Sequence, residues 1–194
     1  MTNFNGQFLK SAADGSGFIK SDLKQIAVCG KSNVGKSSFI NMLANNSKLA
    51  RVSNTPGRTR LVNYFDFEKF ILTDLPGYGF AKAPKAEIEK WQSLIENYLL
   101  NEKNLVRVLF LVDIRHAPTK DDLQLLNYLY FYKIPFNVIA TKADKLSKAE
   151  ISKNLNEIAA ALKIGIDNII YISSVKKTNR EKIVNLIDNI INGI

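Results

Sequence analysis

The stretch VCGKSNVGKSSFIN, residues 28–41, decides the fold of this chain. Two glycines, two lysines and three serines lie between the apolar run QIAVC and the segment FINML. Residues 30–37 match G-x-x-x-x-G-K-[S/T], a pattern that joins a buried strand to a helix and binds phosphate groups. The glycines let the backbone curl until successive N–H groups point inward, and the helix adds the positive end of its dipole.

This phosphate loop (residues 30–37) implies specific contacts with a bound nucleotide. Its lysine, Lys36, reaches the β- and γ-phosphates, and the hydroxyl of Ser37 ligates Mg²⁺. A chance match in a glycine-containing turn is the alternative, but the strand before the loop and the helix after it favour phosphate binding. The residues expected to contact the phosphates are Gly30, Lys31, Ser32, Asn33, Val34, Gly35, Lys36, Ser37 and Ser38.

Strand-like and helix-like patterns alternate along the rest of the chain. Helical periodicity is clear in residues 86–100 and in the last helix, which should end at Gly193. The alternation predicts a three-layer α/β fold: a six-stranded, mostly parallel sheet with one antiparallel strand and helices on both faces. The runs at 61–67 and 70–74 are too close for a crossover helix and should pair as an antiparallel hairpin. The expected strands are 25–29, 61–67, 70–74, 106–113, 136–140 and 169–173.

The domain organisation is simple. We expect residues 1–23 to form an irregular lead-in and residues 24–194 to form one nucleotide-binding domain. Three helix starts carry the spacing of a capping box, in which a hydroxyl precedes an acidic side chain by three residues. These pairs are Thr119 with Asp122, Ser147 with Glu150, and Thr178 with Glu181.

The composition indicates a globular protein with excess positive charge. Of 194 residues, 46% are hydrophobic and 23% are charged, and the net charge is +9. No apolar signal segment or bilayer-length run is visible, which argues against a secreted or membrane-bound protein. The one cysteine, Cys29, lies in an apolar run and fits a buried position in a reducing cytoplasm. The charge favours nucleic acid or an acidic surface as a partner, although many basic proteins bind neither.

Two later motifs predict which nucleotide binds. Asp74 ends a strand and can hold Mg²⁺ through water, while the N–H of Gly77 can sense a γ-phosphate, although an ordinary turn after a strand has the same pattern. Asp144 can accept hydrogen bonds from both N1 and N2 of guanine, which adenine cannot offer. Lys142 can lie across the base plane, and the N–H of Ser174 can face guanine O6. Their order and spacing predict a guanine-nucleotide site and disfavour a P-loop kinase or ATPase.

Five segments resemble those of one bacterial family within the Ras-like P-loop GTPases. GKSNVGKSSFIN, NTPGRTRLVNYF, LTDLPGYGFAK, DIRHAPTKDD and TKADKL are similar to the EngB (YihA/YsxC) ribosome-biogenesis GTP-binding proteins. The resemblance spans about residues 4–192. It implies a monomeric GTP- and GDP-binding protein that acts in assembly of the large ribosomal subunit and contacts rRNA and ribosomal proteins.

The resemblance also implies roles for individual residues. Thr59 takes the switch-I position that closes on Mg²⁺ and the γ-phosphate, so Lys36, Thr59 and Gly77 should support catalysis. Mg²⁺ should be held by Ser37, by Thr59 and, through water, by Asp74. Thr141 replaces the asparagine of N-K-x-D, which removes an amide and implies modest nucleotide affinity. Beyond the phosphate loop, the implied GTP-binding residues are Pro56, Gly57, Arg58, Thr59, Asp74, Leu75, Pro76, Gly77, Thr141, Lys142, Ala143, Asp144, Ser173, Ser174 and Val175.

Two positions bear on the mechanism. Tyr78 stands where Ras-like enzymes carry the glutamine that orients the attacking water, and tyrosine has no amide for that task. We therefore expect slow intrinsic hydrolysis. Asn33 matches a phosphate-loop asparagine that related GTPases use to hold K⁺. It can equally cap the loop or hydrogen-bond switch I.

The DIRHAPT segment is the least interpretable from sequence. His116 is separated in sequence from the phosphate motifs, and we do not expect it to be catalytic. Arg115 either faces a partner or pairs with Asp113 or Asp122. Lys176 is displaced relative to the common S-A-K pattern, which leaves its role open.

Two functions remain open at this point. In the first, GTP orders the switch loops, which then bind a pre-ribosome. In the second, the protein is a nucleotide-regulated RNA-binding module in which hydrolysis is incidental. In the first, the basic side chains that flank or lie in the switch loops meet rRNA phosphates, and the alternative is that they only keep the loops solvated: Lys48, Arg51, Arg58, Arg60, Lys82 and Lys85.

Overall fold

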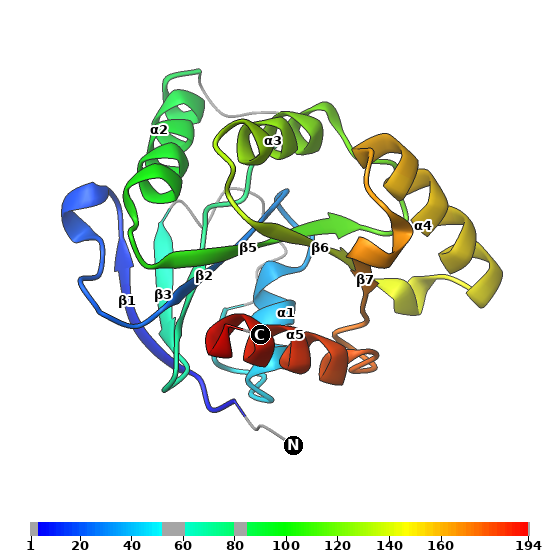
Figure 1. Ribbon diagram of the computed structural model, residues 1–194, viewed down its shortest axis with the longest axis horizontal. Coiled ribbons are helices and arrows are strands. Elements are labelled where there is room, and N and C mark those ends of the chain that lie inside the picture. The colour runs from blue at the N-terminus through cyan, green and yellow to red at the C-terminus, as the bar shows by residue number, and fades with distance from the viewer. Residues whose placement is uncertain (1–3, 52–60, 80–84, 194) are drawn as a thin grey trace.

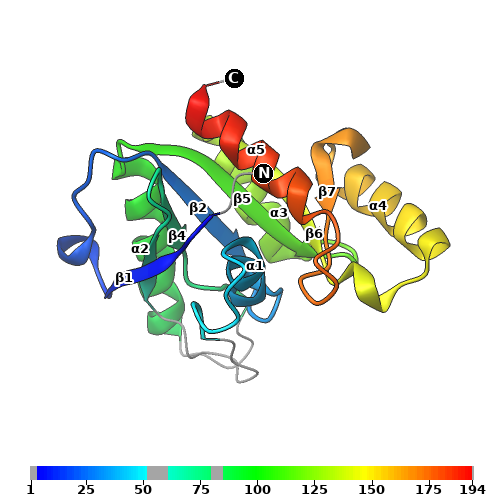
Figure 2. The same cartoon turned by 90° about the horizontal axis from the view of Figure 1, so that it is seen from below.

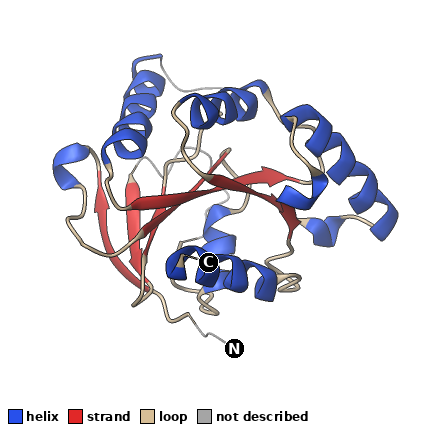
Figure 3. Ribbon diagram, in the orientation of Figure 1, coloured by secondary structure: helices blue, strands red, loops and turns tan. Residues whose placement is uncertain are grey.

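The computed structural model describes residues 4–51, 61–79 and 85–193 of the chain. Within these ranges the side chains of residues 85–88 and of Trp91 are not described. The expected switch-I residues 56–59 lie outside the described residues, and so does Lys82. Figure 1 shows one sheet between two layers of helices, and Figure 3 shows the same layers by secondary structure. The expected three-layer α/β fold is confirmed.

The sheet has seven strands in the order β1-β3-β4-β2-β5-β6-β7. β3 pairs antiparallel with β4 on one side and with β1 on the other, whereas the other neighbouring strands are parallel. The predicted hairpin is therefore confirmed, and β3 is the strand that runs against the others. The strands are β1 (Gln7–Ala12), β2 (Gln25–Gly30), β3 (Val62–Asp66), β4 (Ile71–Asp74), β5 (Leu105–Asp113), β6 (Phe136–Thr141) and β7 (Ile169–Tyr171).

The helices cover both faces of the sheet. Figure 1 and Figure 2 place α2, α3 and α4 on one face and α1 and α5 on the other. Each face buries its own apolar cluster, one containing Phe110 and Leu129 and the other Leu109 and Ile187. No helix among the described residues combines the length and apolar character needed to span a membrane. The helices are α1 (Lys36–Leu43), α2 (Lys85–Asn101), α3 (Lys120–Phe131), α4 (Lys148–Leu162) and α5 (Arg180–Asn192).

The strand count is the main correction to the sequence prediction. We expected six strands and an irregular lead-in, but Gln7–Ala12 forms the edge strand β1, paired with β3 from Gln7–Asp66 to Ala12–Val62. Five of its six residues are exposed, so it lacks the apolar alternation by which strands are recognised. Backbone pairing with β3 holds it in place, a contribution that composition does not reveal.

The helix starts are predicted correctly in two cases of three. Thr119–Asp122 and Ser147–Glu150 both form complete capping boxes. The Thr178–Glu181 prediction is wrong, because α5 begins one residue later, after Asn179 in the left-handed region at φ 57°. Arg180 instead donates from its guanidinium to the carbonyls of Met42 and Leu43, both at 2.8 Å, and so ties α5 to the end of α1.

Candidate nucleotide-binding site

The phosphate loop owes its shape to residues that tolerate unusual backbone angles. Gly30 has φ 154° and Gly35 has φ 109°. A Cβ at Gly30 would lie 2.6 Å from the carbonyl oxygen of Leu111 on the neighbouring strand, so a side chain cannot fit there. Asn33 takes the left-handed region at φ 63°, where asparagine is among the few side chains commonly found. The loop therefore curls away from β2 before α1 begins.

The start of α1 offers donors and positive charge to this loop. Gly35 is the N-cap residue and makes no side-chain cap, so the first N–H groups of the helix have no hydroxyl or carboxylate from the cap. Such a helix start attracts anions. Lys36 opens the helix with its side chain largely buried, and the half-buried Ser37 and Ser38 follow. These residues can surround a phosphate group.

Asp74 lies at the end of β4 with properties that suit a metal ion. Its side chain is buried and accepts a hydrogen bond from Asn63, yet its Oδ1 has no partner among the described residues. Burial raises the pKa of Asp74, and the positive charge of Lys36 opposes that effect. No group of three or more His, Cys, Asp or Glu side chains forms a metal cluster in the described ranges. A cation held here would therefore draw on hydroxyl, water and phosphate oxygens, which Mg²⁺ accepts.

The segment after Asp74 rests on the phosphate loop. Leu75, Pro76 and Gly77 are buried, and the N–H of Ser32 donates to the carbonyl of Tyr78 at 2.9 Å. The segment is therefore in direct contact with the residues expected to bind phosphate.

A second group of contacts joins the loop to the ends of β5 and β6. The hydroxyl of Thr141 lies 2.6 Å from the carbonyl oxygen of Val34 and 3.1 Å from that of Val112. The hydroxyl has one proton, and the shorter distance assigns it to Val34. Threonine thus connects β6 to the phosphate loop through its hydroxyl, although it lacks the amide of the asparagine in N-K-x-D.

Lys142 connects the loop to a charged cluster that sequence reasoning did not identify. Its ammonium donates to the carbonyl of Asn33 at 2.6 Å and lies 2.9 Å from Asp113. Arg115 binds the same carboxylate through two hydrogen bonds, at 2.9 and 2.7 Å, so the pairing of Arg115 with Asp113 is the open alternative that the structure supports. Burial alone would raise the pKa of Asp113, but the hydrogen bonds from Arg115 and Lys142 lower it to about 2.

The expected base-reading residue is oriented by its neighbours. Ser173 donates to Oδ1 of Asp144 at 2.8 Å, and Lys145 lies 3.6 Å from Oδ2. The Asp144 side chain is only 9% exposed. The backbone N–H of Ala143 donates to Ile172, which joins the two loops that carry these residues. Ser174 and the exposed Val175 follow Ser173 directly. The expected base-binding residues therefore lie together at one end of the sheet.

A cavity of about 270 Å³ lies beside the phosphate loop. Its lining includes residues 31–34 of the loop and residues 112, 113 and 115–119 of the segment after β5. His116, distant from the phosphate motifs in sequence, is thus brought close to the loop. The DIRHAPT motif marks this segment as one of interest, but the sequence alone does not show which loop the segment contacts.

Comparisons with known proteins agree with this geometry. The family model described as "50S ribosome-binding GTPase" matches residues 25–142. A probable GTP-binding protein EngB from Mycoplasma capricolum subsp. capricolum is 45% identical over 187 residues, 95% of each chain. The Clostridium acetobutylicum protein of the same description is 45% identical over 190 residues, 97% of this chain and 94% of that one.

Solved structures give the same result at the level of the fold. The crystal structure of a probable GTP-binding protein engB has a TM-score of 0.72 and 27% identity, over 88% of this chain and 100% of that one. Era, crystallised with MgGDPNP and a 16S rRNA fragment, shares the fold at a TM-score of 0.67 and 24% identity, over 87% of this chain and 56% of that one. The chain therefore belongs to the EngB family of P-loop GTPases, which bind and hydrolyse GTP.

Proposed function

We propose that this protein is a slow GTPase that acts as a switch in assembly of the large ribosomal subunit in the cytoplasm. The phosphate loop and Ser38 bind the phosphates, with Lys36 at the β- and γ-phosphates. Ser37, Thr59 and, through water, Asp74 hold Mg²⁺, which neutralises charge on the transferred phosphoryl group. The Oδ1 of buried Asp74, which has no hydrogen-bond partner within the described part of the chain, supports this metal assignment.

The observation that carries the proposal is the orientation of Asp144. Its carboxylate is largely buried and is fixed by the Ser173 hydroxyl at 2.8 Å. An ionised carboxylate in this position can accept two hydrogen bonds from guanine, whereas adenine offers an acceptor at the corresponding ring nitrogen. Thr141 and Lys142 hold the same loop against Val34 and Asn33, which links base binding to phosphate binding. A titration with GDP against ATP tests this part: ATP that competes as well as GDP would contradict it.

Slow hydrolysis follows from the side chain that stands in place of glutamine. The Tyr78 hydroxyl donates to Asp122 at 2.6 Å, so its proton is used within the protein. A K⁺ ion held by Asn33 would supply positive charge to the transition state. Single-turnover rates in K⁺ compared with Na⁺ test this role, and equal rates would exclude it.

The ribosomal role rests on the family description and on charge. The matching family model carries the description of a 50S ribosome-binding GTPase, and the chain has a net charge of +9. Lys48 and Arg51 are exposed just before switch I. Each contact with an rRNA phosphate releases counterions, so binding should weaken steeply with salt.

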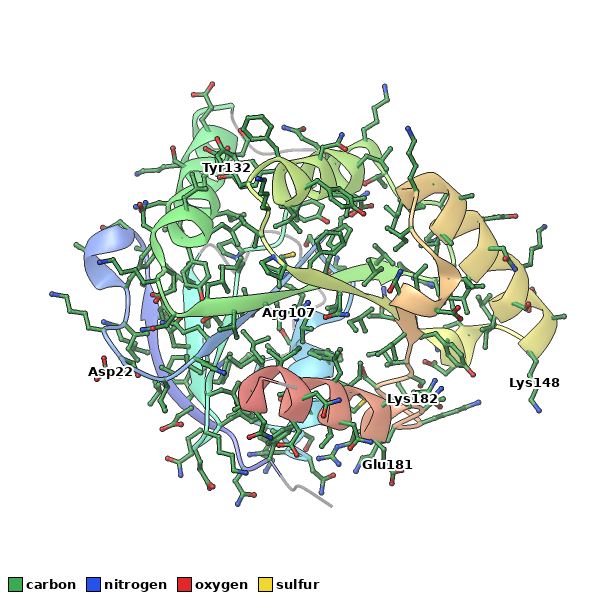
Figure 4. The ribbon with its side chains drawn as sticks, viewed as in Figure 1. Asp22, Arg107, Tyr132, Lys148, Glu181 and Lys182 are labelled. Carbon is green, nitrogen blue, oxygen red and sulfur yellow. The ribbon has the colours of Figure 1, made fainter. Side chains whose placement is uncertain are left out.

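Cosedimentation with large-subunit particles tests the switch directly. We expect tighter binding with a GTP analogue than with GDP or no nucleotide, and loss of the difference in the double reversal Arg58→Glu, Lys82→Glu. The double reversal Lys148→Glu, Lys182→Glu provides a charge-matched control, because both lysines are exposed and lie on α4 and α5 (Figure 4). Equal binding in all nucleotide states would contradict the switch.

The alternative is a nucleotide-regulated RNA-binding module in which hydrolysis is incidental. The Tyr78 hydroxyl favours it, because this hydroxyl is bonded to Asp122 within the protein. Particles that bind in the GTP state but never accelerate turnover would select this alternative. Stimulated turnover would select the switch.

A further inference from the structure

Two basic side chains connect α5 and the loop before it to the end of α1. Arg180, the first residue of α5, donates from Nε to the carbonyl of Met42 and from Nη2 to the carbonyl of Leu43, both at 2.8 Å. Lys177 donates from its ammonium to Oδ1 of Asn45 at 2.5 Å. Figure 1 and Figure 2 both show α5 beside α1. The carboxyl end of α1 is therefore attached to two cations that come from a distant part of the chain.

A cation is well suited to this position. The last carbonyl groups of a helix have no partner within the helix, and they carry the negative end of its dipole. A guanidinium can donate to two such carbonyls at once, and its charge makes each hydrogen bond stronger. Arg180 is only partly exposed, so water competes little for these bonds. The connection between α5 and α1 should therefore be firm.

The segment before α5, residues 173–179, folds back on itself. Ser173 and Thr178 form an antiparallel bridge, in which the N–H of Thr178 donates to the Ser173 carbonyl at 3.1 Å. The hydroxyl of Ser173 also accepts the N–H of Lys176 at 3.0 Å. These contacts make residues 173–179, the base loop, a compact unit.

The two ends of the base loop are held by different parts of the molecule. Its first residue, Ser173, follows Ile172, whose N–H and carbonyl bond at 2.8 and 3.0 Å to the end of β6 and the turn after it. The sheet therefore fixes this end of the loop, together with the bond from Ser173 to Asp144. The other end is attached to α1 through Arg180 and Lys177.

We propose that Arg180, assisted by Lys177, is a positioning residue for guanine recognition. It ties the base loop to α1, the helix whose first turn carries the phosphate-binding residues. This tie sets the direction of the Ser174 N–H, which is expected to face guanine O6. Without it the loop shifts, while Asp144 keeps its place on the sheet. The inference rests on the proposed guanine-nucleotide site and adds a role for two residues that are not among the expected nucleotide contacts.

The test compares GDP with two analogues that differ from it at one position each. IDP lacks the amine that Asp144 reads, and 6-thio-GDP carries sulfur, a weaker acceptor, in place of O6. In Arg180→Met we expect GDP affinity to fall about fivefold, the size of effect found for residues that act on a site indirectly. The preference for GDP over 6-thio-GDP should shrink about threefold, whereas the preference for GDP over IDP should change less than twofold.

Lys24→Met is the matched control. Lys24 also donates to a carbonyl near a helix end, that of Ile191 at 2.6 Å, but at the end of α5 away from the base loop. Both variants should lower the free energy of unfolding, because each loses hydrogen bonds from a charged donor. Only Arg180→Met should change GDP affinity and the preference over 6-thio-GDP.

Two outcomes would overturn the proposal. One is an Arg180→Met variant that unfolds more easily but binds GDP as the parent does, which would make the arginine purely structural. The other is an equal change in both preferences, which would mean that Asp144 moves with the loop. If Arg180→Met fails to fold, Lys177→Met decides, because Lys177 is exposed and its loss should lower GDP affinity about twofold with the same pattern. Failure of the proposed function would look different, since the parent itself would then not prefer GDP over IDP.

Discussion

The two halves of the nucleotide site are built in different ways. The base side is held by side chains that bond across elements, such as Ser173 to Asp144 and Thr141 to Val34. The phosphate side is shaped by backbone, with Gly30 and Gly35 at positive φ and Gly77 against the loop. Deleting a side chain should therefore damage the base side, whereas adding one should damage the phosphate side.

The largest expected effect on nucleotide affinity is on the base side. Asp144→Asn replaces one acceptor oxygen with a donor that faces the guanine amine and ring N–H. GDP affinity should fall about 100-fold, the size of one or two lost hydrogen bonds to a charged group. Affinity for xanthosine diphosphate should rise, because xanthine carries a carbonyl where guanine carries the amine. Ser173→Ala is the graded control and should cost less, since it removes only the orienting bond. Unchanged GDP binding in Asp144→Asn would contradict the base-side assignment.

The second prediction concerns a pair of glycines on the phosphate side. Gly30→Ala places a Cβ 2.6 Å from a strand carbonyl, so either β2 or β5 must move. We expect a loss of about 3 kcal/mol in the free energy of unfolding, at the upper end of ordinary substitutions. At Gly35→Ala the new Cβ meets no atom of the described residues within 4 Å, so this variant should cost only the left-handed backbone penalty, about 1 kcal/mol. Urea titrations of the two variants compare their free energies of unfolding. Equal losses in the two variants would show that the strands move enough to relieve the contact between the new Cβ at position 30 and the strand carbonyl.

The local and the long-range parts of the site differ in how far the sequence could predict them. The phosphate loop is local, so its spacing gave the turn, the helix start and the position of Lys36. The bond from Tyr78 to Asp122 joins residues 44 positions apart, and the cluster around Asp113 draws on three loops. Such contacts depend on which strand ends are neighbours, which the pattern of single segments does not specify. The edge strand β1 escaped prediction because backbone pairing leaves no apolar signature.

The third prediction tests the charged cluster between the two halves. The pKa of Asp113 is lowered from 3.8 to about 2, because hydrogen bonds from Arg115 and Lys142 outweigh the opposing effect of burial. The carboxylate thus stabilises the fold above pH 4, and this contribution is lost as the pH falls through about 2. The shift corresponds to about 1 to 2 kcal/mol after allowance for solvent screening at partly exposed Arg115. Asp113→Asn should therefore be less stable than the parent at pH 6, and the gap should close towards pH 2.5. A gap that stays constant across this range would exclude the charge as its cause.

The smallest effect should come from Thr141, where the two halves meet. Its side chain is buried, and its hydroxyl bonds the end of β6 to the Val34 carbonyl of the phosphate loop at 2.6 Å. Thr141→Val keeps the shape and removes the hydroxyl, so unfolding should become easier by about 1 kcal/mol, the net value of one hydrogen bond. GDP affinity should fall about fivefold, because the loop then loses one of its attachments to the base side and keeps the bond from Lys142 to Asn33. Thr141→Ser keeps the hydroxyl and loses only a methyl group, so it should retain GDP affinity even if it is less stable. Isothermal titration of both variants decides the point. If valine and serine weaken GDP binding equally, packing at position 141 matters and the hydroxyl does not, and the two halves of the site would then act independently.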